Sequence, residues 1–588
     1  MFSRLAIFRS KEAAAQKGKK LDHERFSSQN LSTEDDNSVN DGFYCSLKSM
    51  PAFRSTPEAY FDEPTFQCSN ASCTSSPLSH RNSTLESIES LSSDASQENL
   101  TSSPRQSNEI IISPLVLLPY EEAEEQFLED YESYFLHLAV DNVRKDQYPM
   151  LDMREFIYLD YATCPLYSRF QVEQHMKFLL DETEPFGLNY IVDQKFPLSS
   201  THTDLLCHHI LNILNTTQDD FSVVFTPGLV SSYRLFTEMY KLHKRSLILV
   251  GLDHHGPVQH ILESAAQCNV KVGGIPLKER DLSIHGNEMH KLLRKQGWSG
   301  QGSGLLIYST QSLSTGMCHS MSWITSAQQN GWKVLLDVSS SLPMINIDLS
   351  TYQPEFIIGS LYHMFGYPSS LCFLLVRRSS HSISGKKGSR ELQFIEYPEN
   401  GKAVHVVTEG ENLTAHTFAA MNFGFEHLES IGMVAIQRRV ESLIAWLIKT
   451  LKSLRHKLFE NPLIQLYGSL DVKYRGSILA FNILDPTGNI FPARPVQQLA
   501  LRSNIVLGCC SLFNAKNAKL LHLKSYWRME NGHLDSSLCN LEVLRLSLGP
   551  VSTFSDAYRL VMFISRFRDE KYMSSIAASY AEEIENEC

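Results

Sequence analysis

Residues 334–338 read Val-Leu-Leu-Asp-Val, and residues 356–360 read Phe-Ile-Ile-Gly-Ser. Each is a short apolar run without polar alternation, which is the pattern of a strand buried on both faces. Seven such runs occur between residues 222 and 376. They predict one α/β domain in which seven strands form a mostly parallel sheet with covering helices. The runs are Ser222–Thr226, Leu247–Gly251, Val270–Gly274, Leu305–Ser309, Val334–Val338, Phe356–Ser360 and Leu371–Val376.

The length and composition limit the classes of protein that this chain can belong to. Its 588 residues suit two or three domains, and 53 Lys+Arg against 65 Asp+Glu give a net charge of −12. An acidic chain is not expected to bind nucleic acid or an anionic membrane surface. No apolar run is long enough to span a bilayer. The 12 cysteines form no CxxC pair, so we expect neither a structural zinc site nor any other metal site. A cytoplasmic location is predicted, with a plastid or a mitochondrion as the alternative because the first 26 residues are partly basic.

Composition divides the chain into three regions. Residues 1–108 are predicted to be disordered, since 12 of the 34 residues between Thr74 and Ser107 are serine and offer too little apolar surface for a core. Residues 109–385 are predicted to form the large α/β domain, preceded by an amphipathic helix over Glu121–Lys145. Residues 386–588 are predicted to form a smaller α+β domain that starts with a polar loop. Its helices are expected over Leu413–His456, Pro495–Ser503 and Ser555–Phe567, and its strands over Ser477–Leu484 and Val543–Leu548.

Polar residues follow several of the buried strands, where open α/β sheets bind their ligands. Gly228 lies in a turn that leads into a helix, with Ser231 close behind, and such a turn either holds a phosphate or is an ordinary connection. His254 and His255 follow the second strand; they point in different directions, which argues against a shared metal ion, and one of them can stack on a ring. Asp337 ends the fifth strand and needs a cationic partner if it is buried. We expect Asp337, His255 and Ser360 to meet in one pocket.

The order of these segments resembles the class-V aminotransferase family of pyridoxal-phosphate-dependent proteins, and within it the cysteine desulfurases and the N-terminal domain of molybdenum cofactor sulfurase. Tyr158–Ala162 is similar to the family's opening "YLDxA", Gln311–Gly316 to its "QSNxSG" and Arg545–Pro550 to its closing "RxSxG". The resemblance implies a fold-type-I transferase fold, a homodimer, and pyridoxal phosphate as the cofactor, with Asp337 beside the pyridine nitrogen. The candidate cofactor-binding residues are Asp337, His255, Ser360, Gly228, Ser231 and Tyr362.

Several positions depart from the family pattern. The family's Schiff-base lysine position is His363, and no lysine lies between Lys333 and Lys386. An imidazole cannot form the stable imine that a primary amine forms. The turn after Gly228 has Leu229-Val230 where a Ser/Thr pair is usual, Leu313 replaces the asparagine of "QSN", and Glu411 replaces the hydroxyl of "EGT".

Two adjacent cysteines leave two interpretations open. Asn504–Cys510 resembles the "IxLRxGCFC" stretch that carries the nucleophilic cysteine of the sulfurase branch, so Cys509 or Cys510 is a candidate persulfide carrier. The alternative is a pair of ordinary, partly buried thiols. The departures favour a catalytically degenerate molybdenum cofactor sulfurase-like protein that acts as a scaffold or regulatory partner of another protein, with pyridoxal phosphate either held non-covalently or lost. The alternative is an active pyridoxal-phosphate-dependent sulfurtransferase or cysteine desulfurase that contributes to molybdenum cofactor sulfuration.

Overall fold

The computed structural model describes residues 117–180, 197–240, 242, 246–251, 254–278, 281–297, 304–367, 370–380, 395–396, 404–407, 415–457, 460–513 and 541–587. The predicted disorder of residues 1–108 and the "EGT"-like motif at Glu409–Glu411 lie outside these residues. Residues 106–588 form one compact unit. Within the described part, no helix combines the length and the hydropathy that crossing a membrane requires.

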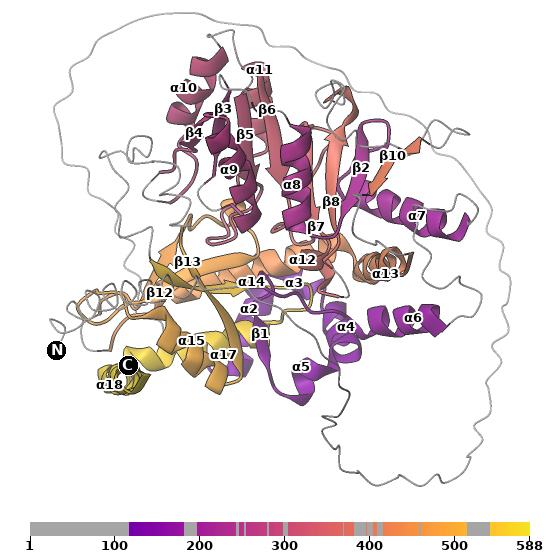
Figure 1. Ribbon diagram of the computed structural model, residues 1–588. Helices are drawn as coiled ribbons and strands as arrows, with labels where there is room; N and C mark the ends of the chain where they lie inside the picture. Colours follow the sequence, from indigo (N-terminus) through magenta and orange to yellow (C-terminus); the bar gives the residue numbers. More distant parts are fainter. Residues whose placement is uncertain are drawn as a thin grey trace, which may run out of the picture. The chain divides into compact units, whose positions relative to one another are not determined.

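A nine-stranded mixed sheet forms the first half of the fold (Figure 1). Its spatial order is β4-β3-β5-β6-β7-β8-β2-β10-β9, and β4 to β7 are parallel. β8 runs antiparallel to both β7 and β2. The strands are β2 (Phe221–Thr226), β3 (Leu247–Val250), β4 (Lys271–Gly274), β5 (Gly304–Ser309), β6 (Trp332–Asp337), β7 (Phe356–Ser360), β8 (Cys372–Arg377), β9 (Ile395–Glu396) and β10 (Val404–Val407).

The seven predicted strands are confirmed as β2 to β8. The prediction that residues 386–588 start with a polar loop is wrong in one respect, because β9 and β10 lie in that stretch and extend the first sheet. The apolar runs have no polar alternation because helices cover both faces. Alternate residues of one strand pack on opposite sides: Leu306 joins the core beneath one helical layer, whereas its neighbour Leu305 joins the core beneath the other.

The two helical layers come from different parts of the chain. One face is covered by α7 (Pro197–Ile213), α10 (Gly286–Gly297), α11 (Ser322–Gln329) and α13 (Ala415–Ile431). The other face is covered by α8 (Leu229–Met239) and α9 (Gln259–Gln267). α8 follows directly from β2, so its residues reach the same sheet edge as the strand ends that carry the polar side chains.

A second sheet of five strands has the order β1-β13-β14-β12-β11. Its strands are β1 (Ile157–Leu159), β11 (Ile464–Tyr467), β12 (Ile478–Ile483), β13 (Ile505–Ser511) and β14 (Glu542–Ser547). β1 pairs in parallel with β13, 348 residues further along (505 minus 157), so the segment before the large sheet lies with the C-terminal sheet. The helices that share the hydrophobic core of this sheet are α2 (Tyr120–Asp130), α3 (Glu132–Phe135), α14 (Met433–Ser453), α15 (Ala493–Arg502), α17 (Phe554–Ser565) and α18 (Glu570–Glu587).

The N-terminal helical segment is less regular than its periodicity predicts. The expected helix over Glu121–Lys145 is divided into α2, α3 and α4 (Ala139–Gln147), and the break after α2 falls at Tyr131, where the backbone leaves helical geometry (φ −128°, ψ 69°). Phe127, Tyr134 and Phe554 stack together there, so tertiary packing competes with helix continuation. α5 (Pro149–Met153) and α6 (Arg169–Leu180) complete the segment.

Two buried polar side chains join the sheets. The side chain of Gln311 accepts a hydrogen bond from the Ser477 N–H (3.0 Å) and donates one to the Ser340 carbonyl (2.5 Å). The Arg475 side chain donates hydrogen bonds to the carbonyls of Thr315 and Tyr467. In the 311–318 loop, Gln311 and Cys318 form a β-bridge with each other, and Met317 forms one with Arg475. Gly316 sits in this loop with φ +76°. The two sheets are therefore connected through residues of the "QSNxSG"-like segment.

Candidate functional site

Asp337 is a buried carboxylate that accepts three hydrogen bonds from the chain. It ends β6 and is 2% exposed. Its Oδ2 accepts hydrogen bonds from the Tyr233 hydroxyl (2.6 Å) and from His255 Nδ1 (2.7 Å), and its Oδ1 accepts one from the Ser339 N–H (2.8 Å). Burial by itself raises the pKa of Asp337, but His255 and the other donors outweigh burial and hold that pKa well below its ordinary value. Asp337 is therefore a carboxylate at neutral pH.

His363 lies next to this group on α12 (Tyr362–Phe365), the short helix after β7. Its ring centroid is 5.7 Å from that of His255. Burial, and then the neighbouring His255, lower the pKa of His363 to about 4, so the imidazole is neutral at pH 7. Its Nδ1 is buried without a hydrogen-bond partner in the described structure.

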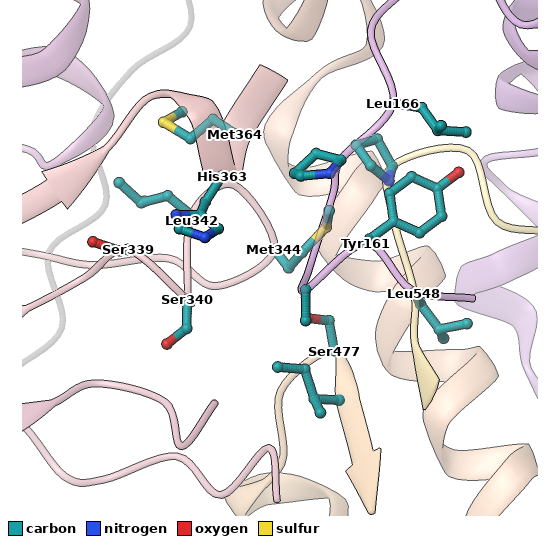
Figure 2. Close-up of a pocket in the computed structure, with 14 residues that line it drawn as sticks. Tyr161, Leu166, Ser339, Ser340, Leu342, Met344, His363, Met364, Ser477 and Leu548 are labelled. Carbon is teal, nitrogen blue, oxygen red and sulfur yellow. The ribbon is translucent and has the colours of Figure 1, made fainter. Parts of the chain in front are cut away.

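A pocket lies between the strand ends of the first sheet and the edge of the second (Figure 2). Ser339, Ser340 and His363 line one side of it, and Tyr161, Ser477 and Leu548 line the other. Among the residues that the structure describes, the Ser339 hydroxyl, the Tyr161 hydroxyl and His363 Nδ1 are buried without a hydrogen-bond partner. The lining residues include no lysine, arginine or carboxylate. The described pocket thus offers hydroxyls, a neutral imidazole and apolar side chains, but no charged group.

The phosphate-loop candidates lie at the start of α8. Gly228 is its N-cap, and Ser231 is half-buried in the first turn. The hydroxyls of Thr226 and Ser232 hydrogen-bond each other (2.5 Å), and the Ser370 hydroxyl donates to the Pro227 carbonyl (2.5 Å). Side chains of the protein therefore already hydrogen-bond the groups of this turn.

Ser360 and Tyr362 lie around α12. The Ser360 hydroxyl accepts a bond from the His363 N–H (3.4 Å), and Ser360 is 3% exposed. The Cys372 thiol interacts with both Ser360 and Asp337, and its pKa is raised to about 12, chiefly by burial. The Tyr362 hydroxyl donates to the sulfur of Cys164 (3.3 Å). Ser360 therefore lies with the Asp337 group, whereas the Tyr362 hydroxyl is engaged with Cys164.

Cys509 and Cys510 lie within β13, paired with Leu544 and Val543 of β14. Burial raises the pKa of Cys509 to about 11 and raises that of Cys510 as well. A thiol with a raised pKa is a weak nucleophile at neutral pH. Both cysteines are thus held by strand pairing in the described structure.

Sequence reasoning missed the roles of two residues that shape this region. Tyr233 is fully buried on α8, five residues after Gly228, and the signal that could have found it is this helix start beside the end of β6. Arg545 bonds Asp160 Oδ1 (3.2 Å) and the Thr163 hydroxyl, so its charge is balanced within the chain. Arg545 opens the "RxSxG"-like segment, but no sequence pattern reports the partners of either residue.

The residues around Asp337 do not fit pyridoxal phosphate bound through an imine. His363 carries no primary amine, and neither do the other described partners of Asp337 or the residues that line the pocket. Asp337 also has three donors from its own chain. The described residues of this site therefore support no reaction step through a covalently held cofactor.

The arrangement of a nine-stranded mixed sheet, a second smaller sheet and polar strand ends at their junction is that of fold-type-I pyridoxal-phosphate-dependent transferases. The apo cysteine desulfurase of Thermococcus onnurineus matches with a TM-score of 0.57 over 72% of this chain and 97% of its own, at 14% identity. The cysteine desulfurase CsdA of Escherichia coli matches with a TM-score of 0.54 over 73% of this chain and 98% of its own, at 18% identity. These identities show the fold alone.

Sequence comparison shows which family part of the chain resembles. Residues 208–488 match the model of aminotransferase class-V. The molybdenum cofactor sulfurase of Arabidopsis thaliana is 25% identical over 498 residues, which cover 75% of this chain and 60% of the relative, and that of Bos taurus is 25% identical over 69% of this chain and 50% of the relative. The match to the class-V aminotransferase model covers slightly less than half of the chain, and the chain spans about half to three fifths of the length of these relatives.

Proposed function

We propose that this chain is a molybdenum cofactor sulfurase-like protein that has lost covalent pyridoxal-phosphate chemistry and acts by binding, as a scaffold or regulatory partner of another protein. The relatives that match it carry the name molybdenum cofactor sulfurase. In this proposal the chain shares the fold of these relatives but does not form a covalent link to pyridoxal phosphate.

The position of His363 carries the proposal. It stands where the family resemblance expects the Schiff-base lysine, and its ring lies 5.7 Å from that of His255, which bonds Asp337. A neutral imidazole in this place can accept or donate a hydrogen bond, but it cannot form the stable imine on which transimination depends. The strand-held Cys509 and Cys510, with raised pKa values, also favour this interpretation over a persulfide carrier.

The assembly and location belong to the same proposal. A homodimer is expected because the family resemblance implies two-fold assembly, which is also the commonest state of homo-oligomers. A cytoplasmic location is expected because the cysteines, apart from the adjacent Cys509 and Cys510, are scattered singly along the sequence and do not form the pattern of a disulfide-rich secreted protein. Light scattering at micromolar concentration tests the first expectation, and a monomeric mass contradicts it.

Borohydride trapping tests the loss of covalent chemistry. The full chain is incubated with pyridoxal phosphate, reduced with borohydride and mapped by peptide mass spectrometry. We expect scattered, substoichiometric adducts on surface lysines and no absorption band of an imine above that background. A single stoichiometric pyridoxyl-lysine within the α/β domain contradicts the proposal and favours the alternative, an active pyridoxal-phosphate-dependent sulfurtransferase of the molybdenum cofactor sulfurase type.

A further inference from the structure

The hydrogen bonds that the Asp337 carboxylate accepts come from other groups of the same chain. Oδ2 accepts two of them, from the Tyr233 hydroxyl and His255 Nδ1, and Oδ1 accepts the Ser339 N–H. All four residues are buried: Tyr233 is 0% exposed and His255 is 5% exposed. A carboxylate ordinarily offers about four acceptor positions, so three donors leave it little capacity for a ligand.

Tyr233 cannot easily leave this position. Its ring belongs to the buried core between α8 and the sheet, together with Phe236 and Val250. Burial, and then the charge of Asp337, raise the pKa of Tyr233 well above its ordinary value, so the phenol keeps the proton that it donates. Moving it away would leave both a buried hydroxyl and part of a buried carboxylate unpaired, which costs more than an ordinary hydrogen bond contributes.

We infer that Tyr233 is a specificity-determining residue that, together with His255, closes Oδ2 of Asp337 to the protonated ring nitrogen of a pyridoxal-type ligand. Both acceptor positions of Oδ2 are occupied, so a ring nitrogen that bonds this oxygen would have to displace one of the two donors. The inference rests on the proposed function and deepens it: the site lacks the amine for a covalent link, and its carboxylate is closed to the non-covalent ring as well. The third donor, the Ser339 N–H, stays compatible with either state because it uses the other oxygen.

Pyridoxine 5′-phosphate is the probe, because it has the ring and the phosphate but no aldehyde to react with lysines. Its binding to the full chain is measured by isothermal calorimetry. We expect no binding to the wild type at millimolar probe, and binding to Tyr233→Phe that is at least tenfold tighter. Adding Asp337→Asn to Tyr233→Phe should abolish that gain. Tyr308→Phe is the matched control, because Tyr308 is also a buried tyrosine on the sheet but its hydroxyl faces the Ser320 carbonyl (3.4 Å) and not Asp337.

Two results overturn the inference. One is wild-type binding that Asp337→Asn weakens and Tyr233→Phe leaves unchanged; the other is a folded Tyr233→Phe variant that gains no binding. If that variant does not fold, the wild type labelled with ¹⁵N-histidine decides: a His255 Nδ1–H resonance shifted by the probe contradicts closure, and an unmoved one supports it. The probe forms no imine, so failure here is distinguishable from failure of the proposed function, which the borohydride experiment reports.

Discussion

The imidazole rings of His255 and His363 lie with their centroids 5.7 Å apart and their planes 47° from each other. His255 bonds the Asp337 carboxylate, whereas Nδ1 of His363 has no partner in the described structure. The two neighbouring imidazoles therefore differ in their environments. His255 is hydrogen-bonded to a carboxylate, whereas burial and the neighbouring His255 lower the pKa of His363 and keep its ring neutral.

This difference predicts a dependence of stability on pH. Because the pKa of His363 is lowered from 6.5 to about 4 in the folded protein, the unfolded chain binds the proton first as the pH falls. The stabilising contribution is present above pH 6.5 and is lost between pH 6.5 and about 4, amounting to roughly 3 kcal/mol at most. Urea unfolding of the wild type and of His363→Gln over this range measures it. His363→Gln should lose less stability on acidification; parallel curves would contradict the lowered pKa.

His427 serves as the comparison for that experiment. Its pKa is also lowered to about 4 by burial, and its Nε2 lies 3.0 Å from the Tyr148 hydroxyl, away from Asp337. His427→Gln should remove a similar part of the acid sensitivity, and the two effects should add because the residues share no partner in the described structure. A strongly non-additive double variant would point to coupling that the contacts do not provide.

Replacing His363 with lysine should restore trapping without restoring tight binding. His363→Lys places an amine beside Asp337, and burial lowers the pKa of such an amine and favours imine formation. After borohydride reduction with pyridoxal phosphate, we expect a single adduct at position 363, with weak affinity that improves when Tyr233→Phe is added. His290→Lys, at an exposed helix position, is the control and should give only background labelling. No adduct at position 363 in a folded His363→Lys variant would contradict the assignment of this position.

Gly316 should be far less tolerant of alanine than Gly331. Both have φ +76°, so both substitutions carry the strain of the left-handed region, roughly 1–2 kcal/mol. A Cβ at Gly316 would also collide with the Ile478 carbonyl of the second sheet, whereas at Gly331 it meets nothing within 4 Å. Thermal unfolding of Gly316→Ala and Gly331→Ala should therefore show a clearly larger loss for the former. Equal losses would mean that the 311–318 loop does not hold the sheets together.

The buried pair Arg144–Asp556 should matter more than the exposed pair Arg144–Asp152. Arg144 donates to both carboxylate oxygens of Asp556 (2.7 and 3.1 Å), and Asp556 also forms the capping box of α17 with Thr553. Asp556→Ala leaves the buried guanidinium with only the half-exposed Asp152 and the Val551 carbonyl as partners and should cost about 3–5 kcal/mol. Asp152→Ala, at a partner that is half exposed, should cost about 1 kcal/mol or less. Denaturant titrations compare the two, and similar losses would refute the ranking.

Cys509 should react slowly with alkylating reagents. Its pKa is raised to about 11 by burial first and by Glu542 next, so little thiolate is present at neutral pH. Iodoacetamide labelling followed by mass spectrometry should modify the exposed Cys268 well before Cys509 or Cys510. Preferential labelling at either strand cysteine would instead support the persulfide-carrier interpretation of the sulfurtransferase alternative.

Much of the first sheet was predictable from local sequence. A strand covered on both faces needs apolar residues at successive positions, and that requirement leaves an unbroken run such as Val334–Leu336, which is visible in the sequence. The polar residue that ends such a run was predictable for the same reason: Asp337 breaks the pattern. The "YLDxA"-like segment, by contrast, carried no sign that its strand β1 joins the second sheet.

What the sequence by itself determined is the set of buried strands, the polar groups at their ends and the histidine where the family resemblance expects a lysine, because each depends on residues close together in the chain. Only the tertiary structure decided which groups satisfy Asp337. Tyr233 lies 104 residues before it and His255 lies 82 residues before it, and both reach the same oxygen because α8 and the loop after β3 meet at the same sheet edge. A buried carboxylate must find donors wherever the fold brings them, and that choice depends on packing in three dimensions, which no local pattern encodes.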